Sequence, residues 1–483
     1  MKLREAGKRL REAGRQLRHP RTLWREHRRL CIAAAAVLVV GVAGAVIAYE
    51  SLKRPADVHN PDALFKPEKP KRQIRKTVPW PLYGYDRART RYLPAKGVRP
   101  PFEDVWRYTG RPLLEFPPVV AAGRLYFVNN SGFAIALDAD TGKQLWKRRI
   151  GELNASSPAY SRGRLYIVNL VPGHVLKLDA RTGKVLWKRR LPGRAESSPV
   201  VVGRTLYFGC EDGNLYALST RNGRVRWSTP LGGPVKSAPA HYGGYLYVGD
   251  YGGYMNAVDA DSGELKWQSD SLGQGFGTSG AFYSTPAVAF GRVYAGNNDS
   301  RVYSFDARDG ELAWSYSTGG YAYSGPAVAR TRHTGPTVYI GSFDGNVYAL
   351  NAKSGEPRWI QSAGGPVIGS LTAIGNIVYV AEFDGTSTTG FAMKTGRRVF
   401  RYSRGTYTPA VSDGHRLYLV GYSSISALQP YKYEARVAAA VEAPKGRARP
   451  RPKKPPAPRT QAAGPKKQIQ QIQQIQQKKK KKK

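Results

Sequence analysis

The chain has 483 residues, including 53 glycines and 30 tyrosines, and its formal net charge is +42. It contains only two cysteines, which excludes a disulfide framework, so the fold must be held by its own core. The charge is concentrated at the ends: residues 1–30 carry eleven Lys or Arg against three Glu, and residues 444–483 carry fifteen and no acid. Both ends are therefore basic appendages.

An apolar run at 31–49 follows the basic leader at 1–30. Its nineteen residues carry no charge, close to the about 20 residues that a helix needs to cross a bilayer. We predict a retained transmembrane helix; the alternative is a cleaved signal peptide, whose apolar core is usually shorter. The arginines before the run favour a cytoplasmic leader. The rest of the chain is then extracytoplasmic, tethered to a bacterial-type cytoplasmic membrane by a single pass.

Residues 50–99 are basic and rich in proline and are predicted to form a stalk. From 100 to 432 the chain repeats a unit of roughly 40 residues. One copy, 157–190, contains four short runs of β-branched and aromatic residues, separated by Gly, Pro, Asn or Asp. Four antiparallel strands per unit, stacked on their neighbours, predict a β-propeller.

The units share a turn written Asp-x-x-Thr-Gly at 138–142 and 179–183 and varied in the other copies, where Gly is kept, and a large aromatic residue follows four positions after the Gly. The turn suits a third-to-fourth strand connection, and the aromatic residue offers a flat face to the next blade. Eight such blade-docking positions occur, at Trp106, Trp146, Trp187, Trp227, Trp267, Trp314, Trp359 and Phe400. Only three strand-like runs follow Phe400, and a spare one surrounds Trp106. We therefore predict an all-β, eight-bladed propeller of four-stranded antiparallel blades, closed by an N-terminal strand.

The repeated pattern Ala-x-Asp-x-x-Thr-Gly-x-x-x-Trp, across roughly 100–430, resembles the PQQ-type β-propeller repeat. That family includes quinoprotein alcohol dehydrogenases and non-enzymatic assembly factors of the BamB type, both with eight-bladed rings. The resemblance is specific for the fold and unspecific for the function.

The resemblance implies what a dehydrogenase of this family would need: a vicinal disulfide, a bound calcium and an aspartate base. The chain has no adjacent cysteines, and Cys210 is expected to be a small buried residue. Oxygen ligands for a hard cation could come from the loops between second and third strands. These candidates are Glu211, Asp212, Asp250, Asp299, Asp344, Glu382 and Asp384, although Asp-Gly sequences also favour tight hairpins. We assign no catalytic residue, cofactor or metal; the alternative is a PQQ-dependent dehydrogenase-like enzyme.

Three loops between consecutive units, at 270–287, 317–327 and 403–410, are rich in aromatic residues among Gly and Ser. They supply a candidate partner-binding face: Phe276, Phe282, Tyr283, Tyr321, Tyr323 and Tyr407. The alternative is that these side chains cap the ring and pack on adjacent blades.

Residues 433–483 are predicted to be a disordered polycationic tail, because the strand pattern stops after Glu434 and residues 443–483 lack aromatic side chains. Its last six residues are candidates for binding anionic polymers or lipids: Lys478, Lys479, Lys480, Lys481, Lys482 and Lys483. The alternative is a tail that only increases solubility, and nucleic acid becomes a partner only if the topology is reversed. The sequence as a whole predicts a membrane-anchored, non-catalytic scaffold that binds envelope proteins; an extracytoplasmic sensor domain is the further alternative.

Overall fold

The computed structural model describes residues 38–42, 44, 55–66, 79–273, 279–383, 385, 387–406 and 408–431. The predicted leader, most of the predicted span and the predicted tail lie outside these residues. Residues 38–42 and 44 are helical, and no helix within the described ranges is long and apolar enough to cross a membrane. The described residues from Asp57 onward, except Gly273, belong to one compact unit.

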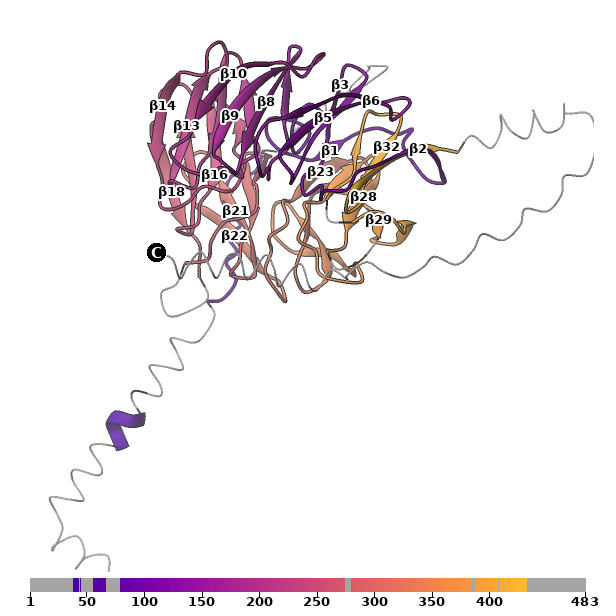
Figure 1. The fold of residues 1–483 in the computed structure, drawn as a ribbon. Coiled ribbons are helices and arrows are strands. Elements are labelled where there is room, and N and C mark those ends of the chain that lie inside the picture. Colours follow the sequence, from indigo (N-terminus) through magenta and orange to yellow (C-terminus); the bar gives the residue numbers. More distant parts are fainter. Residues whose placement is uncertain are drawn as a thin grey trace, which may run out of the picture. The chain divides into compact units, whose positions relative to one another are not determined.

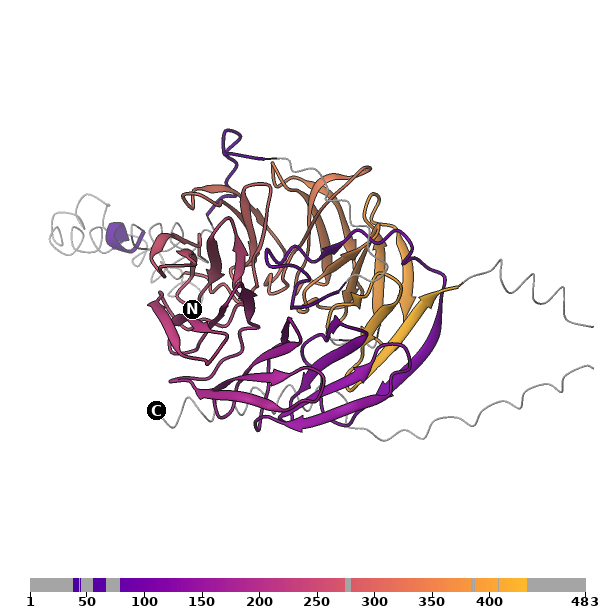
Figure 2. The ribbon, with the colours of Figure 1, turned by 90° about the horizontal axis from the view of Figure 1, so that it is seen from above.

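This unit is a ring of four-stranded sheets, which confirms the predicted eight-bladed propeller (Figures 1 and 2). The strands, from the inner to the outer strand of each blade, are as follows. Blade 1 contains β3 (Val119–Ala121), β4 (Arg124–Asn129), β5 (Phe133–Asp138) and β6 (Gln144–Arg149). Blade 2 contains β7 (Ala159–Ser161), β8 (Arg164–Asn169), β9 (His174–Asp179) and β10 (Val185–Arg190). Blade 3 contains β11 (Val200–Val202), β12 (Thr205–Gly209), β13 (Asn214–Ser219) and β14 (Val225–Pro230). Blade 4 contains β15 (Ala240–Tyr242), β16 (Tyr245–Gly249), β17 (Tyr254–Asp259) and β18 (Leu265–Asp270).

The second half of the ring repeats this order. Blade 5 contains β19 (Ala287–Ala289), β20 (Arg292–Gly296), β21 (Arg301–Asp306) and β22 (Leu312–Ser317). Blade 6 contains β23 (Ala327–Thr331), β24 (Gly335–Gly341), β25 (Asn346–Asn351) and β26 (Pro357–Ser362). Blade 7 contains β27 (Thr372–Ile374), β28 (Ile377–Ala381), β29 (Thr388–Ala392) and β30 (Arg398–Tyr402). Blade 8 contains β31 (Val411–Ser412), β32 (Leu417–Val420), β33 (Ser424–Pro430) and β2 (Phe102–Thr109).

The ring closes where β2 pairs with β33, so the outer strand of blade 8 comes from the start of the propeller sequence, as predicted. Trp106 lies opposite Ala427 in this pair. On the adjacent side, Arg416 of blade 8 donates to Asp140 of blade 1 at 2.6 Å. Closure by pairing leaves no free sheet edge between the first and last blades.

A segment at 79–93 runs along the inner strands of the ring (Figure 2). The second residue of an inner strand donates its backbone N–H to this segment in six blades. The donors are Val120, Tyr160, His241, Val288, Val328 and Ala373, and the acceptors are the carbonyls of Trp80, Pro81, Arg87, Ala88, Thr90 and Arg91. Where the segment meets blade 7 it forms the short parallel strand β1 (Tyr92–Leu93) beside β27. The segment therefore satisfies inner edges that would otherwise need water.

Arg89 anchors this segment. Its guanidinium is fully buried and donates to the carbonyls of Ser198 at 2.8 Å, Pro199 at 3.2 Å and Pro239 at 3.1 Å. These carbonyls precede the inner strands of blades 3 and 4. Burial lowers the pKa of Arg89 to about 9. Hydrogen bonds to several carbonyls offset part of the cost of burying this charge.

These contacts correct the predicted boundary at residue 100. Residues 79–99, assigned to a stalk on composition, lie in the folded body, where Trp80 and Leu93 are buried. Residues 57–60 also join the propeller: Asn60 donates to the Ala313 carbonyl at 2.8 Å, and Ser315 donates to the Val58 carbonyl at 3.0 Å. This stretch therefore covers the outer edge of blade 5. Basic composition concealed it, because the apolar residues that pack are few and widely spaced.

Candidate functional site: the mouth of the ring

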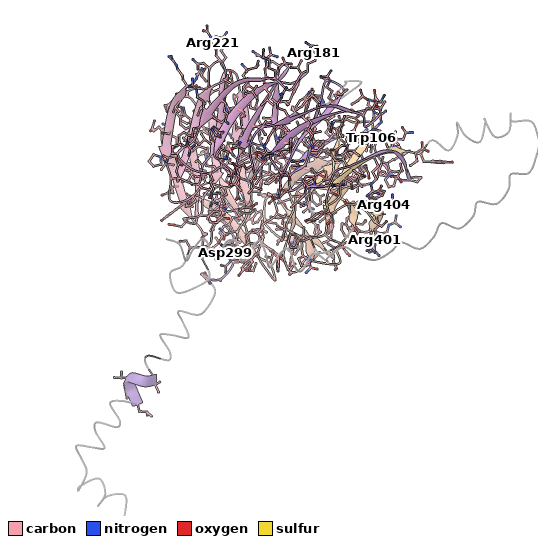
Figure 3. All side chains as sticks on the ribbon, in the orientation of Figure 1. Trp106, Arg181, Arg221, Asp299, Arg401 and Arg404 are labelled. Carbon is pink, nitrogen blue, oxygen red and sulfur yellow. The ribbon has the colours of Figure 1, made fainter. Side chains whose placement is uncertain are left out.

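The loops that join successive blades and the turns between second and third strands lie on one face of the ring, here called the mouth. Asp299 marks this face, on the lower side in Figure 3, whereas Arg181 and Arg221 mark the opposite ends of the blades. A repeated serine fixes the mouth position in five consecutive blades. These serines are Ser156, Ser197, Ser237, Ser284 and Ser324. Ser197, for example, donates to the Ser237 carbonyl of the next blade at 2.9 Å and accepts the Gly209 N–H at 2.9 Å.

The residue before each serine therefore recurs at an equivalent place around the mouth. In blades 3 to 6 these residues are Glu196, Lys236, Tyr283 and Tyr323. The backbone thus places two charged residues beside two aromatic residues along one arc of the mouth.

Charged side chains form the first part of this arc. Lys236 Nζ lies 3.2 Å from Glu196 Oε1 and 3.6 Å from Glu211 Oε1. Glu211 also accepts from Arg194 at 2.8 Å. Arg194, Glu211, Lys236 and Glu196 are thus linked in series by charge-assisted contacts. The two carboxylates are half-buried, so the four side chains form a connected network rather than isolated surface pairs.

Glu115 extends the charged network toward blade 1. Its carboxylate accepts from Asn130 Nδ2 at 3.1 Å. The pKa of Glu115 is raised to about 7, first by burial and also by the charge of Glu196, against the opposing effects of the Asn130 hydrogen bond and the Lys236 charge. The pKa of Glu196 is also raised, first by burial. The mouth therefore contains a carboxyl group that changes charge near neutral pH.

Aromatic rings continue the arc into blades 4 to 6. Lys236 Nζ lies 5.4 Å from the centre of the Tyr251 ring, which joins the charged part to the aromatic part. From there the ring centroids follow in series: Tyr251 to Tyr283 at 6.1 Å, Tyr283 to Tyr323 at 5.8 Å, Tyr323 to Tyr321 at 5.4 Å, and Tyr321 to Phe343 at 6.3 Å. The side chains of Tyr251, Tyr321 and Phe343 are about two fifths exposed, at 40%, 43% and 43%. A continuous aromatic surface is therefore open to solvent.

The predicted partner face is thus partly assembled. Tyr283, Tyr321 and Tyr323 lie together in the aromatic series, whereas Phe276 and Tyr407 fall outside the described residues. Phe282 is fully buried against Tyr303 and Phe305, so it is a core residue, and its place on the face is corrected. Sequence reasoning missed Tyr251, Phe343 and the charged network. Aligning the repeats on the serine would have found Glu196 and Lys236.

The acidic residues proposed as possible cation ligands accept hydrogen bonds or ion pairs from the protein itself, and Glu211 does so within the charged network described above. Asp212 accepts from Asn214 N–H and Tyr216 Oη, and Asp344 accepts from Asn346 N–H and Gly319 N–H. Asp250, Asp299 and Glu382 likewise accept from neighbouring groups, and Asp384 lies outside the described residues. No three His, Cys, Asp or Glu residues in the described ranges could hold a metal ion together. The described carboxylates of this set are therefore held by groups of the protein itself.

Cys210 is buried, and its Sγ donates to the Arg194 carbonyl at 3.3 Å. Burial raises the pKa of this thiol to about 11, so it is protonated at neutral pH.

The repeated tryptophans contact the following blade in every described case. Each indole N–H donates to a backbone carbonyl there, at 3.0 to 3.3 Å: Trp106 to Ala139, Trp146 to Ala180, Trp187 to Thr220, Trp227 to Ala260, Trp267 to Ala307, Trp314 to Ala352 and Trp359 to Met393. The Trp146 ring also packs on Gly183, the glycine of the Thr-Gly turn in blade 2. A Cβ at this position would lie 2.7 Å from the ring, so the contact requires glycine. Phe400, the eighth position, packs instead on Phe102 and Tyr379.

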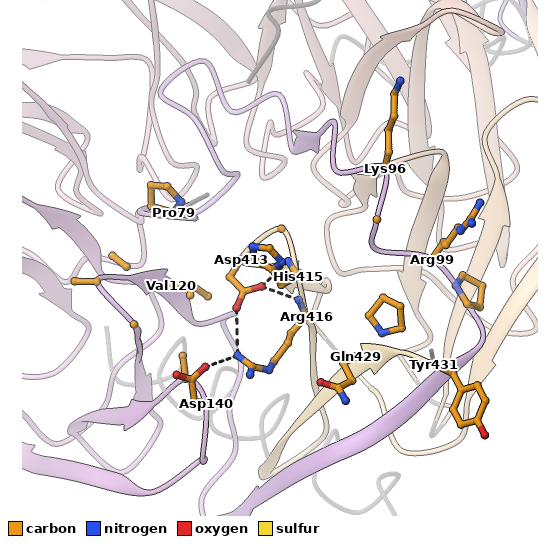
Figure 4. Close-up of a pocket in the computed structure, with 18 of the residues that line it drawn as sticks. Pro79, Lys96, Arg99, Val120, Asp140, Asp413, His415, Arg416, Gln429 and Tyr431 are labelled. Carbon is orange, nitrogen blue, oxygen red and sulfur yellow. Dashed lines mark hydrogen bonds and ion pairs between the residues drawn. The ribbon is translucent and has the colours of Figure 1, made fainter. Parts of the chain in front are cut away.

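A separate pocket of 1610 Å³ lies on the opposite face, where blade 8 meets blade 1 (Figure 4). At its centre Arg416 lies between Asp140 and Asp413, with Nη1 2.6 Å and 3.8 Å from their carboxylates. The pair with Asp140 joins the last blade to the first, whereas Asp413 belongs to blade 8 like Arg416 itself.

Comparisons with known proteins agree with the propeller fold. The sequence profile of a family described as outer membrane protein assembly factor BamB matches residues 102–241, 230–334 and 325–450. BamB from Moraxella catarrhalis is similar in structure, with a TM-score of 0.57 and 19% identity over 68% of this chain and 99% of that one. No curated protein sequence matches the chain.

Quinoprotein enzymes have the same architecture. A europium-containing methanol dehydrogenase gives a TM-score of 0.60 at 14% identity, over 71% of this chain and 89% of that one. The quinohemoprotein alcohol dehydrogenase ADHIIG from Pseudomonas putida HK5 gives 0.61 at 15% identity, over 79% and 83%. At these identities the likeness establishes the fold alone.

Proposed function

This chain belongs to the family of the outer membrane protein assembly factor BamB, and we propose that it is a non-catalytic scaffold whose mouth binds another protein. The observation that carries the proposal is the arc from Glu115 to Phe343, in which a charged network and exposed aromatic rings adjoin. Tyrosine and arginine are enriched among the residues that dominate binding energy at protein interfaces.

The chemistry of the arc describes the partner. Exposed aromatic surface favours an apolar or aromatic side chain of the partner over blades 5 and 6. The acidic groups Glu115, Glu196 and Glu211 favour a cationic side chain over blades 1 to 3. A segment presenting both, in that order, satisfies both parts of the mouth at once.

Membrane attachment and envelope location are also part of the proposal. The apolar run at 31–49 would hold the propeller at the extracytoplasmic side of a cytoplasmic membrane, and Lys478 to Lys483 would contact anionic polymers or lipids. Fusing an enzyme active only outside the cytoplasm after residue 432 tests the orientation. Activity of the fusion supports it, and activity only of a cytoplasmic reporter at the same position contradicts it.

Site-specific crosslinking in native membranes tests the mouth. A photoreactive amino acid replaces Tyr321 or Phe343 in the full chain, and the matched control replaces Lys353, an exposed residue of the opposite face. We expect the same protein adduct from both mouth positions, lost when Tyr251 is changed to Ala, and none from Lys353. Equal adducts from all three positions, or none from the mouth, would reject the proposal.

A cofactor titration tests the enzymatic alternative separately. Because the carboxylates of the mouth are held by Lys236, Asn130 and their own turns, we expect no new visible absorption band when the quinone and calcium are added to the full chain. A saturable band that disappears with a calcium chelator would instead support a quinone-dependent enzyme.

A further inference from the structure

The outer edges of the blades differ sharply in charge around the ring. Three equivalent twelve-residue stretches, 139–150, 180–191 and 220–231, comprise the third-to-fourth strand turns and outer strands of blades 1 to 3. Together they contain twelve Lys or Arg and one acid. The corresponding stretches of blades 4 to 6, at 260–271, 307–318 and 352–363, contain four Lys or Arg and six acids. The same backbone positions therefore carry +11 in one half of the ring and −2 in the other.

All twelve cations are exposed, and we call them the basic face. They are Lys143, Lys147, Arg148, Arg149, Arg181, Lys184, Lys188, Arg189, Arg190, Arg221, Arg224 and Arg226. Figure 3 shows Arg181 and Arg221 at one end of this face, projecting from the turns of blades 2 and 3.

The charges of the basic face are not neutralised within the described part of the chain. None of the twelve forms an ion pair with a described carboxylate, and Asp140, the single acid among them, is held by Arg416. The side chains of Arg148 and Arg189 donate only to backbone carbonyls, of Gly183 and Asn222. The pKa of nearby His174 is lowered by burial and then by the charges of Lys188 and Arg190. A positive potential therefore extends over this surface.

The need to protect exposed sheet edges accounts for some of these residues, because charged side chains on outer strands discourage edge-to-edge pairing. It does not account for their sign or number. Blades 4 to 6 have the same edges and need no comparable excess of one charge, although the outer edge of blade 5 is covered by residues 57–60.

We propose that the basic face binds a linear polyanion whose phosphate groups are contacted by cations of three successive blades. A cation follows the turn glycine in all three blades, at Lys143, Lys184 and Arg224, and the cations at the end of β6 recur at the end of β10. A long ligand therefore engages several of them at once and a small anion engages few. The exposed apolar residues here are single: Leu145 on β6, Leu186 on β10 and Val225 on β14. They do not form the continuous apolar stripe with which a membrane-surface element inserts, and a polymer in solution fits the face better than a lipid surface.

Binding of labelled long-chain polyphosphate to the full chain tests the inference. Lys478 to Lys483 are replaced by Gln in every variant, so that the C-terminal lysines do not mask the face. The test variant adds Lys188→Gln, Arg190→Gln and Arg221→Gln. The control variant adds Lys394→Gln, Arg397→Gln and Arg398→Gln, which remove the same charge from exposed positions of blade 7.

We expect the test variant to lose about tenfold or more in affinity at low salt, and the slope of log affinity against log salt to fall by about 2. The control should change much less, tripolyphosphate should bind far more weakly than the long polymer, and single-stranded DNA should bind like polyphosphate. Circular dichroism and thermal unfolding of both variants check that the ring is intact.

Three results would overturn the inference: equal losses in the two variants, which would reduce the effect to net charge; no binding of polyphosphate; or binding to vesicles containing anionic phospholipid without binding to either polymer. The last result would assign the face to a membrane instead.

Discussion

Blades 1 to 3 and blades 4 to 6 share the same strand order and the same tryptophan contact, yet their outer strands differ in solvent exposure. The outer-strand tryptophans of blades 1 to 3 are half-buried, whereas Trp267, Trp314 and Trp359 are only 8%, 0% and 9% exposed. Residues 57–60 add to the cover of Trp314, since His59 forms a β-bridge with it. At the mouth the halves differ again: the Lys236 network joins carboxylates of the first half, whereas the series of aromatic rings lies over blades 4 to 6. A repeat can therefore keep its scaffold constant while each arc acquires its own surface chemistry.

Removing a tryptophan from each half should give the largest difference. Trp314→Ala deletes a fully buried side chain and its hydrogen bond to Ala352, and we expect a loss of about 3–5 kcal/mol in the free energy of unfolding. Trp146→Ala deletes a half-buried ring and should cost about 1–2 kcal/mol. Urea denaturation of the two variants measures both values. Equal costs would show that the exposure of the indole does not govern its contribution.

The carboxylate at the mouth should make the stability of the ring depend on pH. Burial raises the pKa of Glu115 to about 7 from its ordinary value of 4.5, so the folded chain binds more protons than the unfolded chain between these values. Its contribution to stability must therefore fall as pH rises from 4.5 to 7, and remain low above that range.

Glu115→Gln removes this dependence. Relative to the variant, the parent chain should lose on the order of 1–3 kcal/mol of stability between about pH 5 and about pH 8. Denaturant unfolding of both chains across this range measures the change, and Glu264→Gln, at an exposed position of blade 4, is the matched control. A constant difference between Glu115→Gln and the parent across pH would show that this carboxyl is not shifted.

Self-repulsion within the basic face should give the smallest effect. Replacing Lys188 and Arg190 by Gln relieves repulsion among like charges, and we expect a gain of about 0.5 kcal/mol at low salt that vanishes at high salt. Lys266→Gln on blade 4, where Lys266 pairs with Glu264 at 2.6 Å, should show no gain. Thermal unfolding at two salt concentrations separates these outcomes.

Sequence reasoning reached the fold because the ring is periodic. The turn glycine and the aromatic residue four positions later recur from unit to unit, so counting them gives the blades and leaves one strand for closure. The segment at 79–93 contains no repeated sequence pattern. From sequence alone its Arg89 is expected to be a solvent-exposed charge, and only the structure reveals the backbone carbonyls that bind the buried guanidinium. The mouth was found only in part, since Tyr251 and Phe343 reach it from turns that resemble ordinary hairpins.

The pairing of β2 with β33 has a consequence for how the chain is made. Glu103 lies beside Gln429, 326 positions later, and their side chains share a hydrogen bond of 2.7 Å. During synthesis β2 therefore cannot pair with β33 until nearly all of the propeller has emerged from the ribosome. Contacts so distant in sequence slow folding and leave strand edges exposed meanwhile. The inner segment waits too, since it needs blade 7 for its last contacts. A chain that stopped before β33 would therefore contain the blade 7 strand that the inner segment needs, but not the strand that pairs with β2 and closes the ring.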